Sequence, residues 1–594
     1  MNSESRNQDV AVVGSPSSNA ELTLDLLQEA TEERLVGALT AFQATQNGSQ
    51  ITSVGQVVGI ELRNRWHEDS VFRNLIKRTG EIPPITNRQD TRVANLVVGA
   101  TFRRGDNGFE PEVLGMVPAT GTRVFRVDQP LLDGLLQVYQ DEIVYLGRAY
   151  ANDVLYPMWF KHFGSGAGGA GEAYHLGVFG KTGSGKSGLA KMVLCAYAKH
   201  KNMGILIIDP QGEFSLELSG TRVGQQGLPL DQTIGNLGRN IHVFRIADIQ
   251  LDDWNTFEEM VISLRFLEQL GIPSGSIENC RRAAEVIRNA LEGSHKLENL
   301  GTASAIIDAL NAINDPNNAS FIYSTKARAS QLQQRVQRFL TNQALLAQLL
   351  NQHWQPICEL FMVGQRRRRL FNYAPVEQQS DESRGIVNML LSRVTNEDAR
   401  PVVVVDISRQ GNQRFWSEAL QRRMLSKLLQ VLIAQSTGSL SSQQSANVLV
   451  LLDEAHRHAP SGRLDEDSEA DQLRSLLRRA VRETRKYGLG WFFISQTLGG
   501  VDQEILQQLR ILAFGFGLAL GSEFERLRDF VGGDKRSLEL YQSFRDPQSF
   551  PRQDLQEFPF MAVGPVSPLA FSGKPVFFTA FTDWSEFKRM NKFP

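Results

Sequence analysis

The chain has 594 residues, which exceeds the length that a single hydrophobic core usually organises. We therefore predict about two or three domains. It is 41% hydrophobic and 22% charged, the balance of a folded protein, so disorder cannot dominate it. The 63 lysines and arginines nearly cancel 65 acidic residues, giving a net charge of -2, which excludes a uniformly basic nucleic-acid coat protein.

Cysteine usage and the length of the apolar runs bear on where the chain resides. Only three cysteines occur, without a CxxC pair, which argues against a disulfide framework and against a cysteine zinc site. Residues 1–9 show no signal-peptide pattern. Apolar runs such as residues 448–452 are far shorter than the roughly 20 residues that a membrane helix needs. We therefore expect a cytoplasmic protein without a membrane-spanning segment.

The amino-terminal quarter predicts a small β-domain after a disordered start. Residues 1–20 are rich in Ser, Asn and Gln and lack apolar periodicity, which predicts a disordered tail. A helix is expected near residues 22–42, and short β-rich segments punctuated by glycine follow it up to residue 127. Several short strands before any long helix favour a small β-barrel. Residues 21–160 are therefore predicted to form an amino-terminal helix and β-barrel.

A glycine-rich stretch follows this predicted domain. Residues 164–171 read GSGAGGAG, which formally contains the spacing of a dinucleotide-binding fingerprint. That fingerprint must follow a strand and open a helix, whereas this stretch precedes a new strand. We therefore interpret residues 161–173 as a flexible linker.

From residue 174 the pattern changes to apolar runs that alternate with helical segments, which is typical of a parallel α/β fold. The sequence predicts a core in two parts, residues 174–250 and 386–560, and an extension with strand character at residues 561–594. The predicted core strands are residues 176–179, 205–209, 402–406, 448–453, 491–495 and 511–518.

The segment between the two parts of the core, residues 251–385, is predominantly helical in pattern. Between residues 277 and 291, apolar side chains recur at alternating steps of three and four, which predicts a helix with one buried face. The same spacing recurs at residues 332–339. We expect an inserted helical subdomain whose apolar stripes serve core packing.

Residues 180–187, GKTGSGKS, match the phosphate-binding motif G-x-x-x-x-G-K-[ST] between an apolar strand and a helix. Glycines let backbone N–H groups turn toward phosphates, and the helix amino terminus adds a positive dipole. Lys186 is expected to reach the terminal phosphates and Ser187 to ligate Mg²⁺. A glycine-rich turn without a ligand is the weaker alternative, because the flanking elements fit the motif. The predicted nucleotide-binding residues are Gly180, Lys181, Thr182, Gly183, Ser184, Gly185, Lys186 and Ser187.

A second motif supplies two carboxylates. The apolar residues 448–452 end in Asp453 and Glu454, which predicts Asp453 near the metal and Glu454 where it can activate the attacking water. A solvated strand end is the alternative. Residues 453–456 also spell the DEAH letters of a class of RNA helicases, but this chain lacks the second motor domain that those helicases need.

Two further predictions concern the region around residues 471–496. Gln496 closes an apolar strand at the edge where a γ-phosphate is expected, so we interpret it as a phosphate sensor; a polar residue that merely ends a strand is the alternative. The preceding helix places Arg474, Arg478, Arg482 and Arg485 on one stripe. Such a stripe can simply face solvent, or it can insert an arginine beside the nucleotide of a neighbouring subunit.

Four motifs together resemble the HerA family of hexameric DNA translocases. They are GKTGSGKS at residues 180–187, DPQGEF at 209–214, LLDEAH at 451–456, and RKYG at 485–488 followed by ISQ at 494–496. The order of a small barrel, a RecA-like motor interrupted by helices, and a strand-like tail is also similar to that family. The resemblance spans most of the chain, and the set is more specific than the two Walker motifs alone.

The resemblance implies an ATPase that uses ATP and Mg²⁺. It implies that Lys186 and Ser187 bind both, that Asp453 and Glu454 complete catalysis, and that Gln496 senses phosphate.

The resemblance also suggests roles for further residues, and the chain departs from the family pattern at one place. Arg485 matches the arginine that acts in trans on a neighbour's nucleotide, with Arg482 as a lesser candidate. Asp209 and Glu213 belong to the motif of the second strand. The family often carries an arginine shortly before the P-loop strand, whereas Tyr174 and His175 stand there in this chain.

The family implies a homohexamer that threads double-stranded DNA and grips backbone phosphates without reading sequence. Arg409, in a loop after a predicted strand, is our candidate for a DNA contact. The basic run at residues 366–369 could hold DNA or a partner, but solvent is the default environment of a charge run.

The first functional hypothesis is therefore a translocase that feeds DNA to a separate effector, either a NurA-like nuclease or a sirtuin-like or other effector of antiviral defence. The alternative is a scaffold ring whose ATP binding assembles and switches such an effector with little DNA movement. A membrane-anchored pump is disfavoured because no membrane span is predicted.

Overall fold

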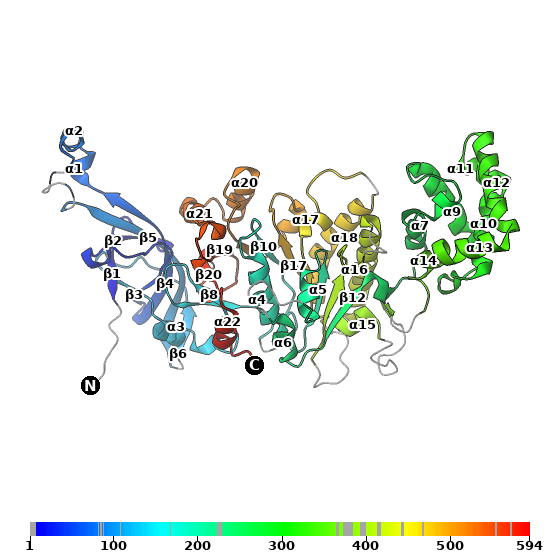
Figure 1. Cartoon of the computed structure of the whole chain (residues 1–594). Coiled ribbons are helices and arrows are strands. Elements are labelled where there is room, and N and C mark those ends of the chain that lie inside the picture. The colour runs from blue at the N-terminus through cyan, green and yellow to red at the C-terminus, as the bar shows by residue number, and fades with distance from the viewer. Residues whose placement is uncertain are drawn as a thin grey trace.

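The computed structural model describes residues 8–594 except 81, 83–85, 87, 107, 167, 222–228, 364–366, 372–383, 392–398, 413–416, 441–444, 466–467, 553–554 and 571–572, and except the side chains of residues 439–440. Three parts lie in a row: a β-barrel, a central α/β domain and a helical subdomain (Figure 1). The predicted α/β class with an amino-terminal barrel is confirmed.

The barrel forms from strands in the order β2-β1-β7-β3-β4-β5 and closes because β2 also pairs with β5. A further strand, β6, pairs with β5 alone. The strands are β1 (Asp9–Val13), β2 (Glu21–Leu26), β3 (Leu39–Gln46), β4 (Ser49–Arg63), β5 (Thr91–Gly105), β6 (Gly108–Glu112) and β7 (Arg123–Arg126). β4 and β5, of 15 residues each, project beyond the barrel and carry α1 (Arg65–Glu68) and α2 (Ser70–Thr79) (Figure 1).

Two expectations for this region are wrong. Within the predicted disordered tail, β1 lies in the barrel, and its Val10, Ala11 and Val13 are buried; residues 1–7 lie outside the described part. In place of the helix expected at residues 22–42, the structure has β2 and β3. The physical reason is that buried Leu22 and Leu24 alternate with less buried neighbours, the period of a strand rather than of a helix.

The central domain is built on an 11-stranded sheet in the order β12-β15-β11-β16-β17-β10-β18-β19-β20-β8-β9. Neighbouring strands are parallel from β12 to β18 and antiparallel from there on. The first group comprises β10 (Leu176–Phe179), β11 (Gly204–Asp209), β12 (Ile241–Arg245), β15 (Val402–Asp406), β16 (Val448–Leu452), β17 (Leu489–Ser495) and β18 (Ile511–Phe514). A strand lies at each predicted core position, although β18 ends at Phe514 rather than at residue 518, and β12 is additional.

The antiparallel end of the sheet joins distant parts of the chain. It contains β8 (Ile143–Ala149), β9 (Leu155–Trp159), β19 (Phe558–Val563) and β20 (Val576–Ala580). Because β20 pairs with β8, two strands from the range assigned to the barrel belong to the central sheet. These strands lie between the barrel and the P-loop strand β10 (Figure 1).

Helices cover the sheet and connect its strands. They are α3 (Gln129–Leu135), α4 (Lys186–Ala198), α5 (Glu213–Leu218), α6 (Leu230–Gly235), α15 (Ile386–Leu391), α16 (Glu418–Leu440), α17 (Ala455–His458), α18 (Glu469–Glu483), α19 (Gln503–Leu506), α20 (Gly521–Phe530), α21 (Lys535–Gln542) and α22 (Trp584–Met590). In the part of the chain that the structure describes, no helix is both long enough and apolar enough to cross a bilayer.

The helical subdomain follows β12. It contains α7 (Trp254–Ser263), α8 (Phe266–Gln269), α9 (Ile277–Glu292), α10 (Ala303–Asn314), α11 (Pro316–Ile322), α12 (Lys326–Thr341), α13 (Gln343–Leu349) and α14 (Gln355–Cys358). The rings of Phe257, Phe266 and Trp354 pack together in its interior. A short parallel pair, β13 (Ile249–Gln250) with β14 (Arg368–Arg369), brings together the two ends of the subdomain.

The strand order decides where chemistry can occur. All parallel strands end at one edge of the sheet, so the loops after β10, β11, β16 and β17 meet there. β17 lies between the P-loop strand β10 and the acid-bearing strand β16.

Candidate active site

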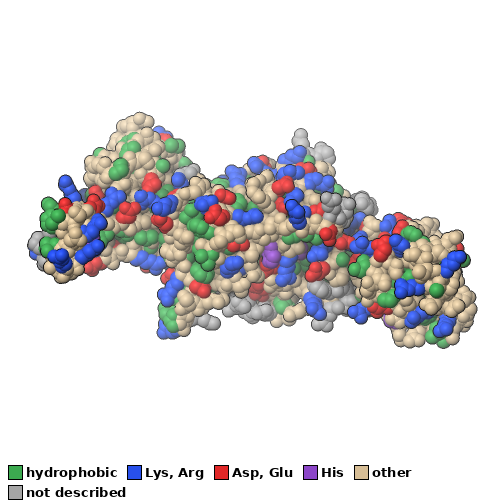
Figure 2. Space-filling view, turned by 90° about the horizontal axis from the view of Figure 1, so that it is seen from above, with side chains coloured by type: hydrophobic (Ala, Val, Ile, Leu, Met, Phe, Trp, Pro, Cys, Tyr) green, Lys and Arg blue, Asp and Glu red, His purple; other side chains and the backbone are tan. Residues whose placement is uncertain are grey.

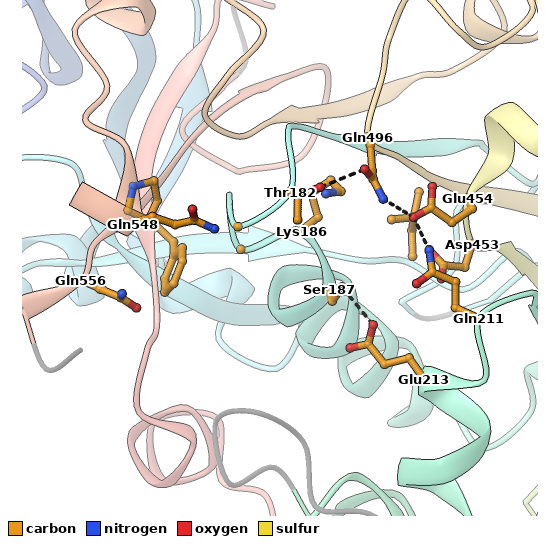
Figure 3. Close-up of a pocket in the computed structure, with 15 residues that line it drawn as sticks. Thr182, Lys186, Ser187, Gln211, Glu213, Asp453, Glu454, Gln496, Gln548 and Gln556 are labelled. Carbon is orange, nitrogen blue, oxygen red and sulfur yellow. Dashed lines mark hydrogen bonds between the residues drawn. The ribbon is translucent and has the colours of Figure 1, made fainter. Parts of the chain in front are cut away.

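A cavity of about 440 Å³ opens at the carboxyl edge of the parallel strands (Figure 3). Its walls come from the loop after β10, the turn after β11, the ends of β16 and β17, and a segment before β19. The lining residues are Thr182, Gly183, Gly185, Lys186, Ser187, Gln211, Glu213, Asp453, Glu454, Ile494, Gln496, Pro547, Gln548, Gln556 and Phe558.

The P-loop has the backbone conformation that its glycines permit. Gly183 and Gly185 have φ values of 84° and 86°, in the left-handed region that other residues rarely adopt. Gly185 is the N-cap of α4, so the helix begins at Lys186 and its free N–H groups face the cavity. A Cβ on Gly185 would lie 2.7 Å from the Phe558 ring. The loop therefore forms a cradle that only glycine leaves open.

Lys186 lies inside this cradle. It is 9% exposed, and its Nζ donates a hydrogen bond of 3.1 Å to the Lys181 carbonyl. Burial lowers the pKa of Lys186, while nearby Glu454 and Asp453 oppose that change. Of the other predicted loop residues, Lys181 is anchored through its N–H to the Phe516 carbonyl at 3.0 Å. Lys186 thus sits between the loop and the two acids.

The two acids predicted from the sequence line the same cavity. Asp453 follows β16 and is buried; this burial, together with the charges of adjacent Glu454 and nearby Asp209, raises its pKa to about 8. Glu454 is also buried and has a φ of 48°, the left-handed region that a non-glycine residue seldom occupies. A strained residue of this kind persists only where the surrounding structure holds it.

Two glutamines hold one oxygen of Glu454. Gln211 Nε2 donates to Glu454 Oε1 at 2.5 Å, and Gln496 Nε2 donates to the same oxygen at 2.6 Å (Figure 3). The second oxygen, Oε2, is buried, accepts no hydrogen bond from the described residues and lies 3.3 Å from His456 Nδ1. One carboxylate oxygen is thus fixed by two amides, while the other is buried beside His456 and accepts no hydrogen bond from the described residues.

Gln496 also contacts the P-loop. Its Oε1 accepts a hydrogen bond of 2.9 Å from Thr182 Oγ1 (Figure 3). A change at Thr182 can therefore be transmitted to Glu454 through one amide. Gln211 was missed in the sequence analysis, although the argument applied to Gln496, a polar residue just beyond a buried strand, would have found it.

The turn after β11 is fixed by Asp209. This buried carboxylate accepts hydrogen bonds from the Gly212 N–H at 2.8 Å and from the Ser215 N–H and hydroxyl at 2.7 Å each. Burial raises its pKa. Asp209 holds the turn that carries Gln211 and Glu213 into the cavity wall, which is a structural function.

Glu213 connects the P-loop helix to a buried ion network. Ser187 Oγ donates to Glu213 at 3.4 Å, and Lys191 Nζ lies 2.5 Å from Glu213 and 2.8 Å from Glu217. Lys191 is 3% exposed and lies on α4 one turn after Ser187. The lysine compensates two carboxylates and fixes Glu213 beside the Ser187 hydroxyl.

The donor set at this end of the cavity fits Mg²⁺. Ser187 and Asp453 offer hard oxygen ligands, and Glu454 Oε2 is a buried acceptor without a hydrogen bond. No group of three or more His, Cys, Asp or Glu among the described residues could hold a metal by itself. Mg²⁺ does not need one, because it is usually held by one or two protein oxygens together with phosphate oxygens and waters.

The arginine stripe is present, and its members pair within the chain. Arg474 binds Asp471 at 2.6 Å, and Arg478 binds Asp502 at 2.5 Å. Arg482 lies 3.5 Å from Glu504 and is 55% exposed. Arg485, on the turn after α18, pairs with Glu172 and is 52% exposed. Arg485 is not among the residues that line the cavity of its own chain.

His175 lies beneath Arg485 and joins three elements. Its Nε2–H donates to the Val481 carbonyl at 2.8 Å, and its Nδ1 accepts from the Trp491 N–H at 3.2 Å, which fixes a neutral ring. Burial, assisted by the positive charge of Arg485, lowers the pKa of His175 to about 4. Burial also lowers the pKa of His458 to about 4.

These histidines make stability depend on pH. An unfolded histidine has a pKa near 6.5, so the contribution of each buried neutral ring to the free energy of unfolding is fully present above that pH. The contribution decreases as the pH falls toward 4, by about 1.4 kcal/mol per pH unit for each ring. We expect the change in thermal midpoint from pH 7.5 to pH 5 to be less destabilising in His175→Gln than in the wild type, because the variant lacks one of the two buried rings. The exposed His67→Gln serves as the control; an unchanged slope in His175→Gln would contradict the assignment.

The candidate DNA contact and the basic run lie in different surroundings. Arg409 is exposed in the loop after β15. In the basic run at residues 366–369, Arg366 lies outside the described residues, Arg367 binds Glu359 at 2.9 Å, and Arg369 lies 3.9 Å from Glu298. Figure 2 shows positive and negative side chains interspersed over the face in view.

Comparison with known proteins identifies part of the chain. The family described as helicase HerA, central domain, matches residues 173–394. This match begins just before β10 and includes the P-loop, the turn after β11 and the helical subdomain. No curated protein matches the chain.

Three solved structures match the chain at low identity and low TM-score. The bacterial conjugative coupling protein TrwB is 14% identical with a TM-score of 0.35, covering 77% of this chain and 92% of that chain. VirB4 of Thermoanaerobacter pseudethanolicus is 13% identical with a TM-score of 0.32, covering 74% and 96%. The genome packaging NTPase B204 of Sulfolobus turreted icosahedral virus 2, solved with ATP-γ-S, is 9% identical with a TM-score of 0.28, covering 69% and 98%.

Proposed function

We propose that this chain, which contains the helicase HerA central domain over residues 173–394, is an ATP-hydrolysing motor that moves double-stranded DNA. The observation that carries the proposal is the meeting of Lys186, Ser187, Asp453 and Glu454 around one cavity. A P-loop alone binds nucleotide, whereas hydrolysis also needs a carboxylate near the metal and a group that positions water. The cavity supplies all of these.

Each residue has a task in this proposal. The P-loop N–H groups and Lys186 bind the β- and γ-phosphates. Ser187 and Asp453 hold Mg²⁺, which when bound neutralises charge on the phosphate oxygens. Glu454 takes a proton from the attacking water, and Gln211 and Gln496 orient it through their shared bonds to Oε1.

Gln496 acts as the phosphate sensor. In the structure its Oε1 accepts the Thr182 hydroxyl, and its Nε2 holds Glu454. A γ-phosphate on the P-loop competes for the Thr182 hydroxyl, which frees the Gln496 amide to adjust Glu454. Nucleotide occupancy and the position of the base are therefore coupled through one side chain.

The proposed assembly is a homohexamer with DNA in its central pore. Arg485 lies on a surface away from the walls of its own cavity, which supports action on the nucleotide of a neighbouring subunit. Near-neutral overall charge is compatible with DNA binding because only the pore loops need to be basic, and Arg409 remains our candidate there. The partner is a separate nuclease, NurA-like or belonging to antiviral defence, or a sirtuin-like effector.

The second candidate is an ATP-dependent scaffold ring that assembles and switches the same effector without moving DNA. The observation in its favour is the β4–β5 arm, which holds Leu62 and Val71 at 63% and 70% exposed. Leu62 lies on β4 and Val71 on α2, which this arm carries, so the arm exposes apolar side chains that another protein could cover.

The test is electron microscopy of the full chain with a non-hydrolysable ATP analogue and duplex DNA, together with ATPase assays with and without DNA. We expect six-membered rings with density in the pore, and hydrolysis that duplex DNA stimulates and that Lys186→Ala abolishes. Rings with an empty pore and hydrolysis indifferent to DNA would favour the scaffold. Monomers without hydrolysis would contradict both functions.

A further inference from the structure

The strand order gives the cavity two chemically different ends. From β10, the sheet continues on one side through β17, β16 and β11, which carry Gln496, the two acids and Glu213. On the other side it continues through β18 to β19. A nucleoside triphosphate that directs its γ-phosphate toward the acids must therefore direct its base toward the β18–β19 side.

That second end is lined by a segment for which the sequence suggested no function. Pro547 and Gln548 belong to the turn before β19, Gln556 lies shortly before that strand, and Phe558 is its first residue. In Figure 3 the labelled Gln548 and Gln556 lie across the P-loop from Asp453 and Glu454. The cavity is continuous between the two groups.

These side chains press against the P-loop. A Cβ on Gly185 would lie 2.7 Å from the Phe558 ring, and a Cβ on Gly183 would collide with the Gln548 amide. The Gln548 backbone is fixed because its N–H donates to Asp546 at 2.9 Å. Among the described residues, the amides of Gln548 and Gln556 have no hydrogen-bond partner. Two free amides beside an aromatic ring thus face the same space.

We propose that Gln548, Gln556 and Phe558 form the nucleobase subsite of the cavity and that it takes adenine. This inference rests on the proposed function as an ATPase. A glutamine amide offers one donor and one acceptor, the pair that matches the amino group and a ring nitrogen of adenine. Phe558 supplies an apolar face for the base.

The uncharged side chains at this end favour adenine over guanine. In protein–DNA contacts, the O6 and N7 acceptors of guanine are most often read by arginine or lysine. Among the described lining residues of this end, Pro547, Gln548, Gln556 and Phe558, none is charged. The subsite also makes β19 sensitive to nucleotide, and β19 leads through β20 to β8 near the barrel.

The experiment separates the base from the phosphates. Binding of ATP, GTP and inorganic tripolyphosphate to the full chain is measured by calorimetry with Mg²⁺. We expect Gln548→Ala to weaken ATP about threefold to tenfold, the loss of one hydrogen bond, and to leave tripolyphosphate binding unchanged. Phe558→Leu is expected to weaken ATP by about tenfold through lost stacking, also without effect on tripolyphosphate. Wild-type protein is expected to bind ATP more tightly than GTP.

Control variants distinguish a failure of the nucleobase subsite from a failure of the proposed ATPase function. Gln507→Ala, an exposed glutamine on the surface after α19, should bind every ligand like wild type, and Lys186→Ala should weaken ATP and tripolyphosphate alike. Gln548 is exposed, so its variant tests the subsite even if Phe558→Leu fails to fold. Unchanged ATP binding in Gln548→Ala, with the Lys186→Ala effect intact, would overturn the subsite alone. Equal affinity for GTP would overturn the adenine assignment, and unchanged ATP binding in Lys186→Ala would overturn the proposed function.

Discussion

Glu454→Gln is expected to lower ATP hydrolysis by about 10²- to 10⁴-fold, the usual contribution of a general base, while ATP binding persists. The amide cannot take a proton from water, but it has nearly the size of the carboxylate. Its oxygen can still accept from Gln211 and Gln496, which hold Glu454 Oε1 at 2.5 Å and 2.6 Å. The measurements are single-turnover hydrolysis and equilibrium binding of ATP.

The matched control is Glu285→Gln, an exposed carboxylate on α9 in the helical subdomain, which should hydrolyse ATP like wild type. If Glu454→Gln hydrolysed ATP at a rate within a few-fold of wild type, Glu454 would not be the general base. The same variant separates the two functions: a motor should stop moving DNA, whereas a scaffold should still assemble its effector. Full biological function in Glu454→Gln would overturn the motor.

The central fold and the phosphate end of the site could be predicted because both follow from local pattern. Runs such as residues 402–406 are buried on both faces, so they read as strands of a parallel sheet. Parallel strands end at one edge, and this rule alone predicts that Asp453 and Glu454 approach Lys186. The structure has them lining one cavity with it.

The remaining features depend on contacts that no local pattern records. β1 is a five-residue strand in a polar setting, and it becomes a strand because β2 and β7 pair with it. β8 joins the central sheet only because β20, near the other end of the chain, pairs with it. Gln548 lies in a turn, and its position beside Gly183 is set by the packing of β19 against the rest of the sheet.

The arginine stripe shows that helical spacing predicts which residues share one side of a helix but not what that side contacts. Helical spacing correctly places Arg474, Arg478 and Arg482 on one side of α18, but it does not identify the group that this side faces. In the structure the stripe faces carboxylates of its own chain. Arg485 differs from these three arginines because its partner, Glu172, lies in the predicted linker. Both side chains of this pair are about half exposed.

Arg485→Ala alone is expected to lower hydrolysis by about 10³-fold or more, the effect of removing an arginine that stabilises charge on the transferred phosphoryl group. Under the proposed action of Arg485 in trans, its loss should be compensated in mixed rings. A Lys186→Ala subunit has a defective cavity but a normal Arg485, whereas an Arg485→Ala subunit has a normal cavity. Where the two meet in the correct order, one complete site forms.

Mixing the two inactive variants in equal amounts is therefore expected to restore about a quarter of wild-type hydrolysis, because half of the cavities are intact and half of those have an intact neighbour. Subunit exchange is verified by co-purification of differently tagged chains. Arg479→Ala, an exposed arginine on α18, the helix that precedes the turn of Arg485, serves as the control and should stay active in unmixed rings. If verified mixed rings remained inactive, Arg485 would not act across the interface. Its pairing with Glu172 would then be a feature of the single subunit, and another group would have to stabilise the transferred phosphate.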